Sequence, residues 1–385
     1  MIHRPVIGIN ACRARSGGAV AHLIGLVERS DPERHGFAAL HLWAFDGLLA
    51  RVPDRPWLHK HSTGRWQASV PLELFWERFL LPAAAKRAGI DLLFNVDAGS
   101  VCPFRPSVTM SQDMLPFEPG EMERYAAGKA RLRLQALRHV QTASLRNADG
   151  AIFLTRYAAE RIGQATGPLR HVAIVPHGID QRFVDMPRRA SPAAPKALHD
   201  CIYISNAAPY KHQWHVVEAI AQLRARGIPL RLRLVGGGSG PAMERLMAAV
   251  ERHDPARDFV TLEPFVPHAE IPDLLARADI FLFASSCESM PVTLLEGMAA
   301  GLPIACSERG PMPDILQDAG AYFNPELPES IADAVGALAC NPVESNAYAD
   351  RAKAIAQSFS WQRCADQTFD FLLSTLKRSH GERAA

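Results

Sequence analysis

One stretch of the chain indicates how the rest is built: Phe281-Leu-Phe-Ala-Ser-Ser-Cys-Glu288-Ser-Met-Pro-Val-Thr-Leu-Leu-Glu296-Gly-Met-Ala-Ala-Gly301-Leu-Pro303. Residues 279–284 form a short, nearly continuous apolar run, which is typical of a parallel strand buried on both faces. Residues 285–291 interrupt the run. Residues 293–300 then follow a helical pattern, which Gly301 ends. The stretch therefore predicts a strand, a loop and a helix in succession.

Two carboxylates flank the start of the predicted helix, Glu288 before it and Glu296 in its first turns. A helix N-terminus after such a strand offers unpaired N–H groups and a partial positive charge, which together bind phosphate. The arrangement suits a ligand that carries both a diphosphate and sugar hydroxyls. The same residues also fit a capping box, in which Glu296 only satisfies the backbone of Thr293. The stretch alone leaves both interpretations open.

The composition is that of a globular protein with a large core, since 48% of the 385 residues are hydrophobic and 21% are charged. This length predicts two or three domains. The formal net charge of +2 argues against a general nucleic-acid binder, because such proteins carry a strong basic excess. A local basic patch is still compatible with it.

Cysteine and histidine usage gives no sign of disulfides or of a metal centre. The seven cysteines are scattered, odd in number and without a C-x-x-C pair, which fits a reducing compartment. The pairs His59-x-His61 and His212-x-x-His215 lack a third ligand nearby in the sequence, so no metal is expected. We recognise neither a signal peptide nor an apolar run of about 18 residues. We therefore expect a cytoplasmic protein, which can also rest on the cytoplasmic face of the inner membrane.

Strand-like and helix-like segments alternate along both halves of the chain. We predict an N-terminal domain over 1–185, a C-terminal domain over 196–360, and a final helix over 361–385 that crosses back to the first domain. The segment 186–195 is expected to be the linker, because it is rich in Pro, Ala and Arg and has no periodicity. Residues 48–69 are expected to be irregular.

This alternation implies an α/β protein with two parallel, doubly wound sheets and right-handed crossovers. Ligands of such sheets bind outside the carboxyl ends of the strands. Several polar residues and glycines fall at such ends: Gly17, Gly18, Gln112, Asp113, Asn206, Gly236 and Glu288.

The spacing Glu288-x7-Glu296, followed by Gly-Met-Ala-Ala-Gly-Leu-Pro, resembles the retaining glycosyltransferases of family 4. The resemblance covers most of the chain and is strongest over 201–325. It implies the GT-B fold, in which two Rossmann-like domains face each other across a cleft. It also implies that Glu288 lies by the donor sugar, that Glu296 binds the ribose of the sugar nucleotide, and that the donor contacts Met290, Pro291, Val292 and Thr293. The loop lacks the glycine of the commoner family pattern, which restricts close backbone approach.

The segment Ser205-Asn206-Ala-Ala-Pro-Tyr210-Lys211-His212 resembles the family's phosphate-binding element. Lys211 stands at the position of the family's phosphate lysine, where it would neutralise the leaving diphosphate. Asn206 replaces the usual arginine, so one cation is missing. Taken without the resemblance, Lys211 is equally an ordinary solvated lysine at a helix start.

Glycine-rich turns supply further candidate donor contacts. The resemblance makes Gly17 and Gly18 the loop of the N-terminal domain whose amides reach the donor phosphate. Gly236 opens a Gly-rich turn, which is read either as part of the nucleotide site or as a plain tight turn before the helix start at Pro241. Phe265 and Val266 end the next strand, where family members hold the base through backbone groups.

Gln112 stands where many family members carry a histidine that helps to hold the donor sugar. A glutamine side chain donates and accepts hydrogen bonds but is neither an acid nor a base near neutral pH. Catalysis then depends on the leaving phosphate taking the proton of the acceptor, as is proposed for retaining enzymes of this fold. An inactive homologue is the alternative.

A basic stretch over 124–146 carries six lysines or arginines and no acid. Arg124, Arg131 and Arg138 recur every seven residues and so share roughly one helical face. A basic amphipathic helix can rest on anionic lipid or meet a lipid-diphosphate acceptor. A solvated helix face packed on its own domain is the alternative.

Together these observations predict an enzyme, a retaining hexosyltransferase that acts on a bacterial glycan or lipid-linked glycan. Glu288, Lys211 and Gln112 are its candidate catalytic residues. The resemblance is greatest to bacterial surface-polysaccharide mannosyltransferases, which implies GDP-mannose as donor substrate and neither cofactor nor metal. The alternatives are a GT-B epimerase or phosphorylase, and a non-catalytic scaffold in polysaccharide assembly.

Overall fold

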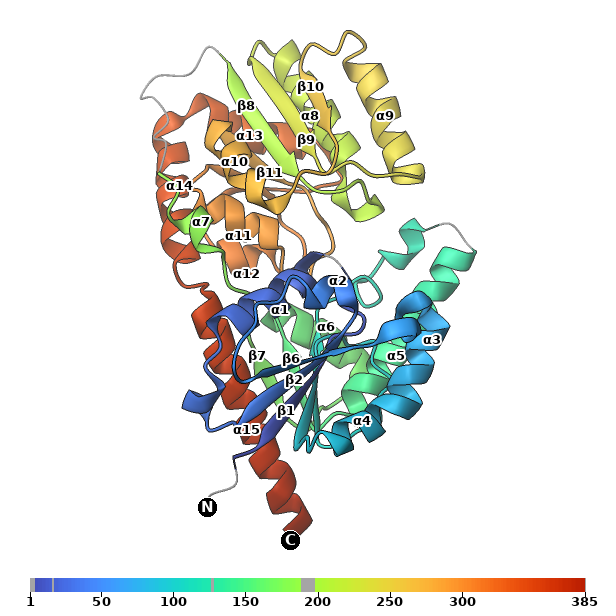
Figure 1. The fold of residues 1–385 in the computed structure, drawn as a ribbon. Coiled ribbons are helices and arrows are strands. Elements are labelled where there is room, and N and C mark those ends of the chain that lie inside the picture. Colours follow the sequence, from blue (N-terminus) through green and yellow to red (C-terminus); the bar gives the residue numbers. More distant parts are fainter. Residues whose placement is uncertain (1–3, 16, 126–127, 188–197, 385) are drawn as a thin grey trace. The chain divides into compact units, whose positions relative to one another are not determined.

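A computed structural model describes residues 4–15, 17–125, 128–187 and 198–384. The chain divides into two compact units (Figure 1), one made of residues 1–178 and 360–385 and the other of residues 179–359. The boundary therefore lies earlier than the sequence predicted, because residues 179–185 belong to the second unit. Most of the predicted linker, residues 188–195, lies outside the described residues.

The first unit is built on a seven-stranded parallel sheet with the strand order β3-β2-β1-β4-β5-β6-β7. The chain runs outward from β1 on one side and then returns to continue from β4 on the other, as in a doubly wound fold. The strands are β1 (Val6–Asn10), β2 (Ala39–Ala44), β3 (Leu58–Ser62), β4 (Leu92–Asn95), β5 (Ser107–Ser111), β6 (Gly150–Phe153) and β7 (Val172–Ile174).

Helices connect these strands: α1 (Gly17–Arg29), η1 (Pro32–His35), α2 (Asp46–Leu49), η2 (Gly64–Ala68), α3 (Val70–Phe75), η3 (Trp76–Leu80), α4 (Leu81–Arg87), η4 (Met122–Arg124), α5 (Lys129–Asn147), α6 (Arg156–Thr166) and α15 (Trp361–Ala384). Of these, α3, η3 and α4 are consecutive, and η3 is a π-helical turn. The final helix α15 packs against α1, and the approach is close: a Cβ on Gly25 would lie 2.3 Å from the indole of Trp361.

The prediction that residues 48–69 are irregular was wrong, since β3 pairs in register with β2 there and the helical turn η2 follows it within the same range. The sequence of β3, Leu-His-Lys-His-Ser, has neither an apolar run nor strong β formers, because it is an edge strand with an exposed face. Burial on both faces is the signal that reveals parallel strands, and an edge strand lacks it.

The second unit repeats the same topology with a six-stranded parallel sheet of order β10-β9-β8-β11-β12-β13. Its strands are β8 (His199–Ile204), β9 (Leu230–Val235), β10 (Val260–Glu263), β11 (Ile280–Phe283), β12 (Ile304–Ser307) and β13 (Ala321–Phe323). Both β11 and β12 are buried at every residue, as their apolar runs predicted. The point where the strand order reverses lies between β8 and β11, which are hydrogen-bonded neighbours.

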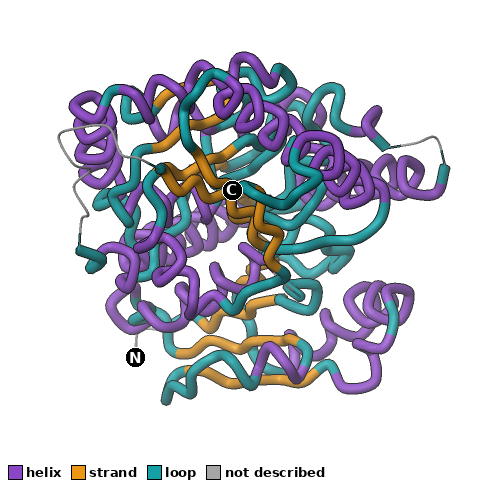
Figure 2. Tube along the Cα trace, turned by 90° about the horizontal axis from the view of Figure 1, so that it is seen from above, coloured by secondary structure: helices purple, strands orange, loops and turns teal. Residues whose placement is uncertain are grey.

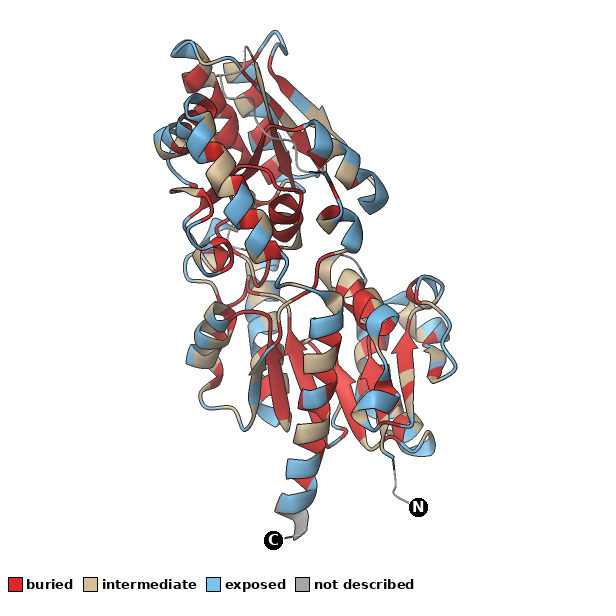
Figure 3. Cartoon of the chain, turned by 90° about the vertical axis from the view of Figure 1, so that its left-hand side faces the viewer, coloured by how far each residue is buried: buried red, intermediate tan, exposed pale blue. Residues whose placement is uncertain are grey.

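The helices of the second unit are α7 (Gln181–Val184), η5 (Pro209–Lys211), α8 (Gln213–Ala225), α9 (Pro241–His253), η6 (His268–Glu270), α10 (Ile271–Arg277), α11 (Val292–Ala299), α12 (Met312–Leu316), α13 (Pro328–Cys340) and α14 (Pro342–Ala356). In each unit the helices flank the strands (Figure 2). Buried residues gather on the strands, and exposed residues lie on the outer faces of the helices (Figure 3). The predicted class of two Rossmann-like domains is confirmed.

Candidate functional site

Two loops meet where the strand order of the second sheet reverses, one after β8 and one after β11. The first loop brings Lys211 and the second brings Glu288, and the two side chains form an ion pair. Only 11% of the Lys211 side chain and 15% of the Glu288 side chain are exposed. Lys211 is therefore no ordinary solvated lysine, which contradicts that alternative.

Aromatic rings and a buried phenol hold Lys211 in place. Its Nζ lies 5.2 Å from the ring centre of Tyr210 and 5.5 Å from that of Phe283, both within range of cation–π attraction. The hydroxyl of Tyr203 donates a 2.9 Å hydrogen bond to the Lys211 carbonyl. Burial, and then the nearby Glu288 carboxylate, raise the pKa of Tyr203 well above its ordinary value, so the phenol stays a donor.

His212 joins the same two loops behind the ion pair. It adopts a left-handed conformation with φ 48°, and its buried Nε2 lies 2.9 Å from the Ser286 hydroxyl. The Ser286 amide donates a 2.8 Å hydrogen bond to the Tyr210 carbonyl. These bonds fix the loop after β8 to the loop after β11, which preorganises the pair of Lys211 and Glu288.

Glu296 lies in the first turns of α11 and is only 3% exposed. Its Oε1 lies 2.6 Å from Nε2 of His268, a residue at the start of η6. The hydrogen bond to Glu296 raises the pKa of His268, and burial raises the pKa of Glu296. The other imidazole nitrogen of His268 lies 3.5 Å from the Arg182 guanidinium, which is itself paired with Asp180.

The capping-box alternative for Glu296 is wrong. Helix α11 begins at Val292 with Pro291 before it, and no side chain makes a capping hydrogen bond at that end. Thr293 lies inside the helix, and the Glu296 carboxyl contacts His268 instead. Glu296 is therefore a buried carboxyl with a specific partner, and capping does not explain its presence.

The glycine turn after β9 fits closely against the loop after β8. Gly236 has φ 130°, and a Cβ there would lie 2.6 Å from the backbone of Ser205. The Gly237 carbonyl accepts a 2.8 Å hydrogen bond from the Ala207 amide. Helix α9 then begins at Pro241, as the tight-turn interpretation predicted, so the turn both ends a strand and packs against the candidate phosphate loop.

The remaining predicted residues of this unit lie on the same edge of the sheet. Asn206 is exposed and follows β8 directly. Phe265 and Val266 follow β10, and Phe265 is 79% exposed, which is the largest exposure of any large hydrophobic side chain among the described residues. Met290 and Pro291 are buried beside Glu288. Their roles toward a donor stay predictions.

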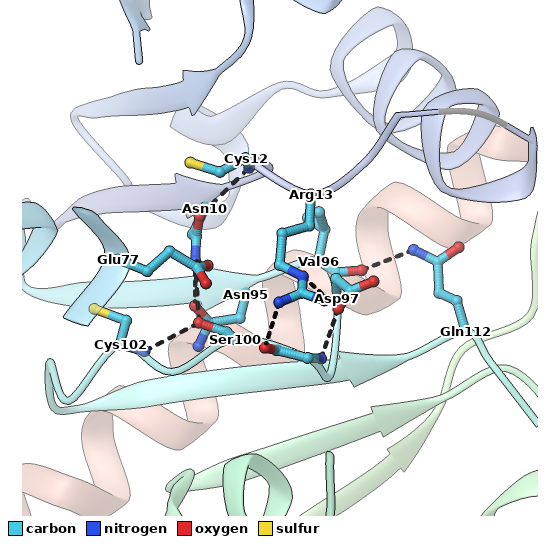
Figure 4. A network of polar contacts seen from close by, with 11 residues as sticks. Asn10, Cys12, Arg13, Glu77, Asn95, Val96, Asp97, Ser100, Cys102 and Gln112 are labelled. Carbon is cyan, nitrogen blue, oxygen red and sulfur yellow. Dashed lines mark hydrogen bonds and ion pairs between the residues drawn. The ribbon is translucent and has the colours of Figure 1, made fainter. Parts of the chain in front are cut away.

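A polar network lies at the carboxyl ends of β1 and β4 in the first unit (Figure 4). The side-chain amide of Asn10 lies 2.6 Å from Glu77 Oε1, 3.0 Å from Asn95 Oδ1 and 3.1 Å from Ser100 Oγ. Glu77 belongs to the π-helical turn and is 1% exposed. Burial raises the pKa of Glu77 above its ordinary value, so the neutral acid is favoured relative to an exposed glutamate.

Gln112 lies after β5, near the same edge (Figure 4). Its side-chain nitrogen donates a 2.9 Å hydrogen bond to the Val96 carbonyl, and its buried Oε1 has no partner among the described residues. Burial raises the pKa of the neighbouring Asp113. Gln112 therefore has its acceptor atom available and no proton to exchange.

Two arginines of the loop between β1 and α1 are functional candidates that sequence reasoning missed. Arg13 donates to the Gly99 carbonyl at 3.2 Å and lies 3.8 Å from Asp97, while Arg15 pairs with Glu73. They precede Gly17 and Gly18, the first two residues of α1. Their position just before a predicted phosphate loop was the available signal. A Cβ on Gly18 would meet only His177, at 3.8 Å, so packing does not explain that glycine.

The basic stretch differs from the single helical face that we predicted. Helix α5 begins at Lys129, so Arg124 lies outside it, in η4, where it pairs with Glu121. Arg131 lies 3.4 Å from Glu123. Acids just upstream of the stretch therefore offset part of its charge.

No group of three metal-ligating side chains is found in the ranges that the structure describes. Within the same ranges, none of the helices is long and apolar enough to span a bilayer.

Residues 199–341 match the family model described as Glycosyl transferases group 1. The matched segment runs from β8 to the end of α13 and includes the loops that carry Lys211, Glu288 and Glu296. This is the part of the chain where the sequence resemblance was strongest.

Curated relatives match part of the chain. It is 30% identical over 176 residues to a protein of Escherichia coli (strain K12) named "Putative colanic acid biosynthesis glycosyltransferase WcaL", and the match covers 44% of this chain and 42% of the relative. It is 29% identical over 212 residues to the GDP-mannose-dependent alpha-(1-6)-phosphatidylinositol monomannoside mannosyltransferase of Mycolicibacterium smegmatis, covering 51% of this chain and 54% of the relative. The chain spans about half the length of the curated relatives that it matches.

Solved structures match nearly the whole chain. HepE of Anabaena in complex with UDP has a TM-score of 0.71 at 18% identity and covers 96% of this chain and all of its own. Sucrose-phosphate synthase of Thermosynechococcus elongatus has a TM-score of 0.73 at 17% identity and covers 99% of this chain. Identities this low bear on the fold alone, and they agree with two Rossmann-like domains of the GT-B class.

Proposed function

We propose that the chain is a retaining glycosyltransferase, because residues 199–341 match the family model described as Glycosyl transferases group 1. It moves a hexose from a nucleotide diphosphate sugar to a bacterial glycan or lipid-linked glycan. The observation that carries this proposal is the buried pair of Lys211 and Glu288 at the reversal point of the second sheet. Such reversal points are where open α/β sheets bind nucleotides.

In the proposed reaction the bond between the anomeric carbon and the diphosphate oxygen breaks, and the acceptor oxygen bonds to the same carbon on the same face. The Lys211 ammonium compensates the charge that develops on the leaving diphosphate. The acceptor proton passes to that phosphate oxygen, so no protein base is required. This assignment is compatible with Gln112, whose amide can hold a sugar hydroxyl but cannot take a proton.

Glu288 and Glu296 are proposed to hold hydroxyls of the donor. A carboxylate is a strong acceptor for sugar hydroxyls, and both groups are fixed by partners of opposite charge or by hydrogen bonds. We propose that no metal and no cofactor take part, since Lys211 supplies the charge that a divalent ion supplies in other transferases.

We propose a mannosyl donor, GDP-mannose, because several of the relatives are named as mannosyltransferases, and three of these names include "GDP-mannose-dependent". A uridine base is the competing possibility, since HepE is named in complexes with UDP and UDP-glucose. A panel of GDP-mannose, GDP-fucose, UDP-glucose and UDP-N-acetylglucosamine therefore decides it.

The test measures release of free nucleoside diphosphate from each donor, with and without acceptor extract. We expect release from one donor, its loss in Glu288→Ala, and no change in the control Asp333→Ala, an exposed acid of the same unit. Interconversion of sugar nucleotides would identify an epimerase, and phosphate-dependent glycan cleavage a phosphorylase. Donor binding without turnover would identify the scaffold. Each of these three outcomes overturns the transferase.

We also propose that the protein works in the cytoplasm and touches anionic lipid through Arg131, Arg133 and Arg138 of α5. Sedimentation with phosphatidylglycerol vesicles tests this contact. Neutralising these three residues should abolish sedimentation, while neutralising Arg226, Arg231 and Arg351 of the second unit, which are similarly exposed, should not. Binding that survives the first triple change contradicts the lipid contact.

A further inference from the structure

The first unit contains a pocket of about 680 Å³ that the candidate catalytic residues do not line. Residues of α3 and η3 form one wall, and residues of α5 form another. The carboxyl half of β4 and the middle of β5 supply the floor, with Asn95 and Thr109. Its size lies within the range of small-molecule sites in proteins.

Aromatic side chains of α3 and η3 line the pocket while remaining exposed. Phe75 is 47% exposed and Phe79 is 60% exposed, and their ring centres lie 5.0 Å apart. Trp66 extends the row, since its ring stacks on Phe75 at 5.8 Å. Contiguous exposed apolar surface of this kind marks a binding site more often than single exposed residues do.

The charge of the pocket lining is entirely positive. Arg78 and Arg105 line it, and no aspartate or glutamate does. Arg105 is paired with Asp149 outside the lining. Arg78 makes no ion pair with any residue in the described ranges, and its guanidinium lies 5.8 Å from the ring of Phe79. The Arg78 guanidinium can therefore form an ion pair with an anionic group of a ligand.

A buried hydrogen bond on the interior side of η3 fixes the wall that carries Phe75 and Phe79. The π-helical turn places Glu77 in the interior, where Asn10 bonds it, while Phe75 and Phe79 stay at the surface. Asn95 and Ser100, which both line the pocket, bond to the same Asn10 amide (Figure 4). Single π-helical turns are frequent at functional sites. The network makes the pocket preformed, which lowers the cost of binding.

We propose that this pocket binds the apolar chain of an anionic amphiphile, a prenyl or acyl chain that ends in phosphate, with the phosphate at Arg78. The exposed aromatic rings favour a chain over a glycan, because Asn95 and Ser100 already bond to Asn10 and are less available for the hydrogen bonds that a buried sugar needs. The inference rests on the proposed function in one respect only, namely that the bound lipid is the acceptor of the transferred sugar.

The test is calorimetric titration of the full chain with farnesyl phosphate, farnesol and inorganic phosphate, below the micelle concentration of each lipid. Farnesyl phosphate should bind most tightly. The double variant Phe75→Ala, Phe79→Ala should weaken its binding at least tenfold. Arg78→Gln should weaken farnesyl phosphate and leave farnesol unchanged. Val172→Ala, which alters another exposed apolar residue of the first unit, is the matched control and should bind as the unaltered protein does.

Three results would overturn the proposed lipid site: farnesyl phosphate binding that survives the double variant, equally tight binding of inorganic phosphate, or binding of an oligosaccharide instead of the lipid. A protein that binds vesicles but no monomeric lipid would also overturn it and would make the aromatic row a bilayer contact. Thermal unfolding of each variant confirms that the fold is kept. Donor turnover is measured separately, since it depends on Lys211 and Glu288. Lipid binding without donor turnover refutes the transferase alone, and donor turnover without lipid binding refutes the lipid site alone.

Discussion

Lys211 and Glu288 form an ion pair between two loops that follow neighbouring strands, β8 and β11. They come from positions far apart in the chain and meet only because the strand order reverses between those strands. A pair so placed is available to a charged ligand and is shielded from most solvent, so each partner should matter to turnover more than an exposed pair would.

Replacing Lys211 by alanine should lower donor turnover about 10²- to 10³-fold, because one fixed positive group is lost at the leaving diphosphate. Lys211→Arg keeps the charge but not the compact ammonium, and should retain part of the activity. Steady-state measurement of nucleotide release checks both. Lys86→Ala, an exposed lysine of the first unit, is the control. Unchanged turnover in Lys211→Ala would contradict the role.

His268 and Glu296 predict how stability depends on pH. The hydrogen bond to Glu296 raises the pKa of His268, and burial raises the pKa of Glu296, so the folded state holds these protons more firmly than the unfolded state. The contribution of His268 is fully present below its ordinary pKa of 6.5 and is lost as the pH rises through the raised folded value. The free energy of unfolding should therefore fall from pH 6 to pH 8.5.

Urea denaturation at the two pH values measures this slope. In His268→Gln the part of the slope due to the imidazole should disappear. His253→Gln, a histidine of the same unit on α9, should leave the slope unchanged. A slope that is the same in His268→Gln and in the unaltered protein would show that the pair of His268 and Glu296 does not hold a proton.

Gly236 should be the least replaceable glycine of the second unit. Gly236→Ala combines φ 130° with a Cβ that would lie 2.6 Å from the Ser205 backbone. Both the loop after β8 and the turn after β9 must then move, so we expect a loss of about 1–3 kcal/mol of stability and weaker donor binding. Gly227→Ala has φ 84° but no neighbour within 4 Å, and should cost about 1 kcal/mol without affecting the donor. Equal donor affinity in both variants would contradict the packing argument.

Glu77 offers a test of the polar network. Glu77→Gln keeps an acceptor for the Asn10 amide and removes the group whose pKa burial raises. Because a raised folded pKa makes stability fall with rising pH, Glu77→Gln should be the more stable protein at pH 8. Glu77→Ala should lose about 1–3 kcal/mol at the same pH, since the buried Asn10 amide loses a partner. Denaturation at pH 5 and pH 8 compares the three proteins, and a Glu77→Gln less stable than the original at pH 8 would refute the prediction.

Much of the fold could be predicted from the sequence, because a strand buried on both faces shows itself as an apolar run. The segments Ile280–Phe283 and Ile304–Ser307 are of this kind. β3 could not be predicted because an edge strand carries polar residues. The domain boundary was misplaced because we inferred it from the Pro-rich composition of residues 186–195. The chain leaves the first unit earlier, at Gly178, where the composition does not change.

The candidate site was predictable to the extent that each of its residues lies in a recognisable motif. Glu288 and Lys211 were found through spacing and resemblance, and their ion pair follows from the strand order. The partner of Glu296, His268, could not be found, because nothing in a sequence indicates which residue of another loop faces a buried carboxyl. The contact of Glu77 with Asn10 could not be predicted either, because the two residues lie in distant segments and no local pattern indicates the π-helical turn that brings them together.

The second unit is continuous in sequence, whereas the first is completed only by the segment that begins at Ser360. The two ends of the second unit are neighbours, since the Ile179 amide donates a 3.2 Å hydrogen bond to the Phe359 carbonyl. During synthesis the second unit can therefore close while the first still lacks α15. Until Trp361 arrives, the surface of α1 around Gly25 stays uncovered. The second unit can therefore finish folding during translation before the first unit, which needs α15, is complete.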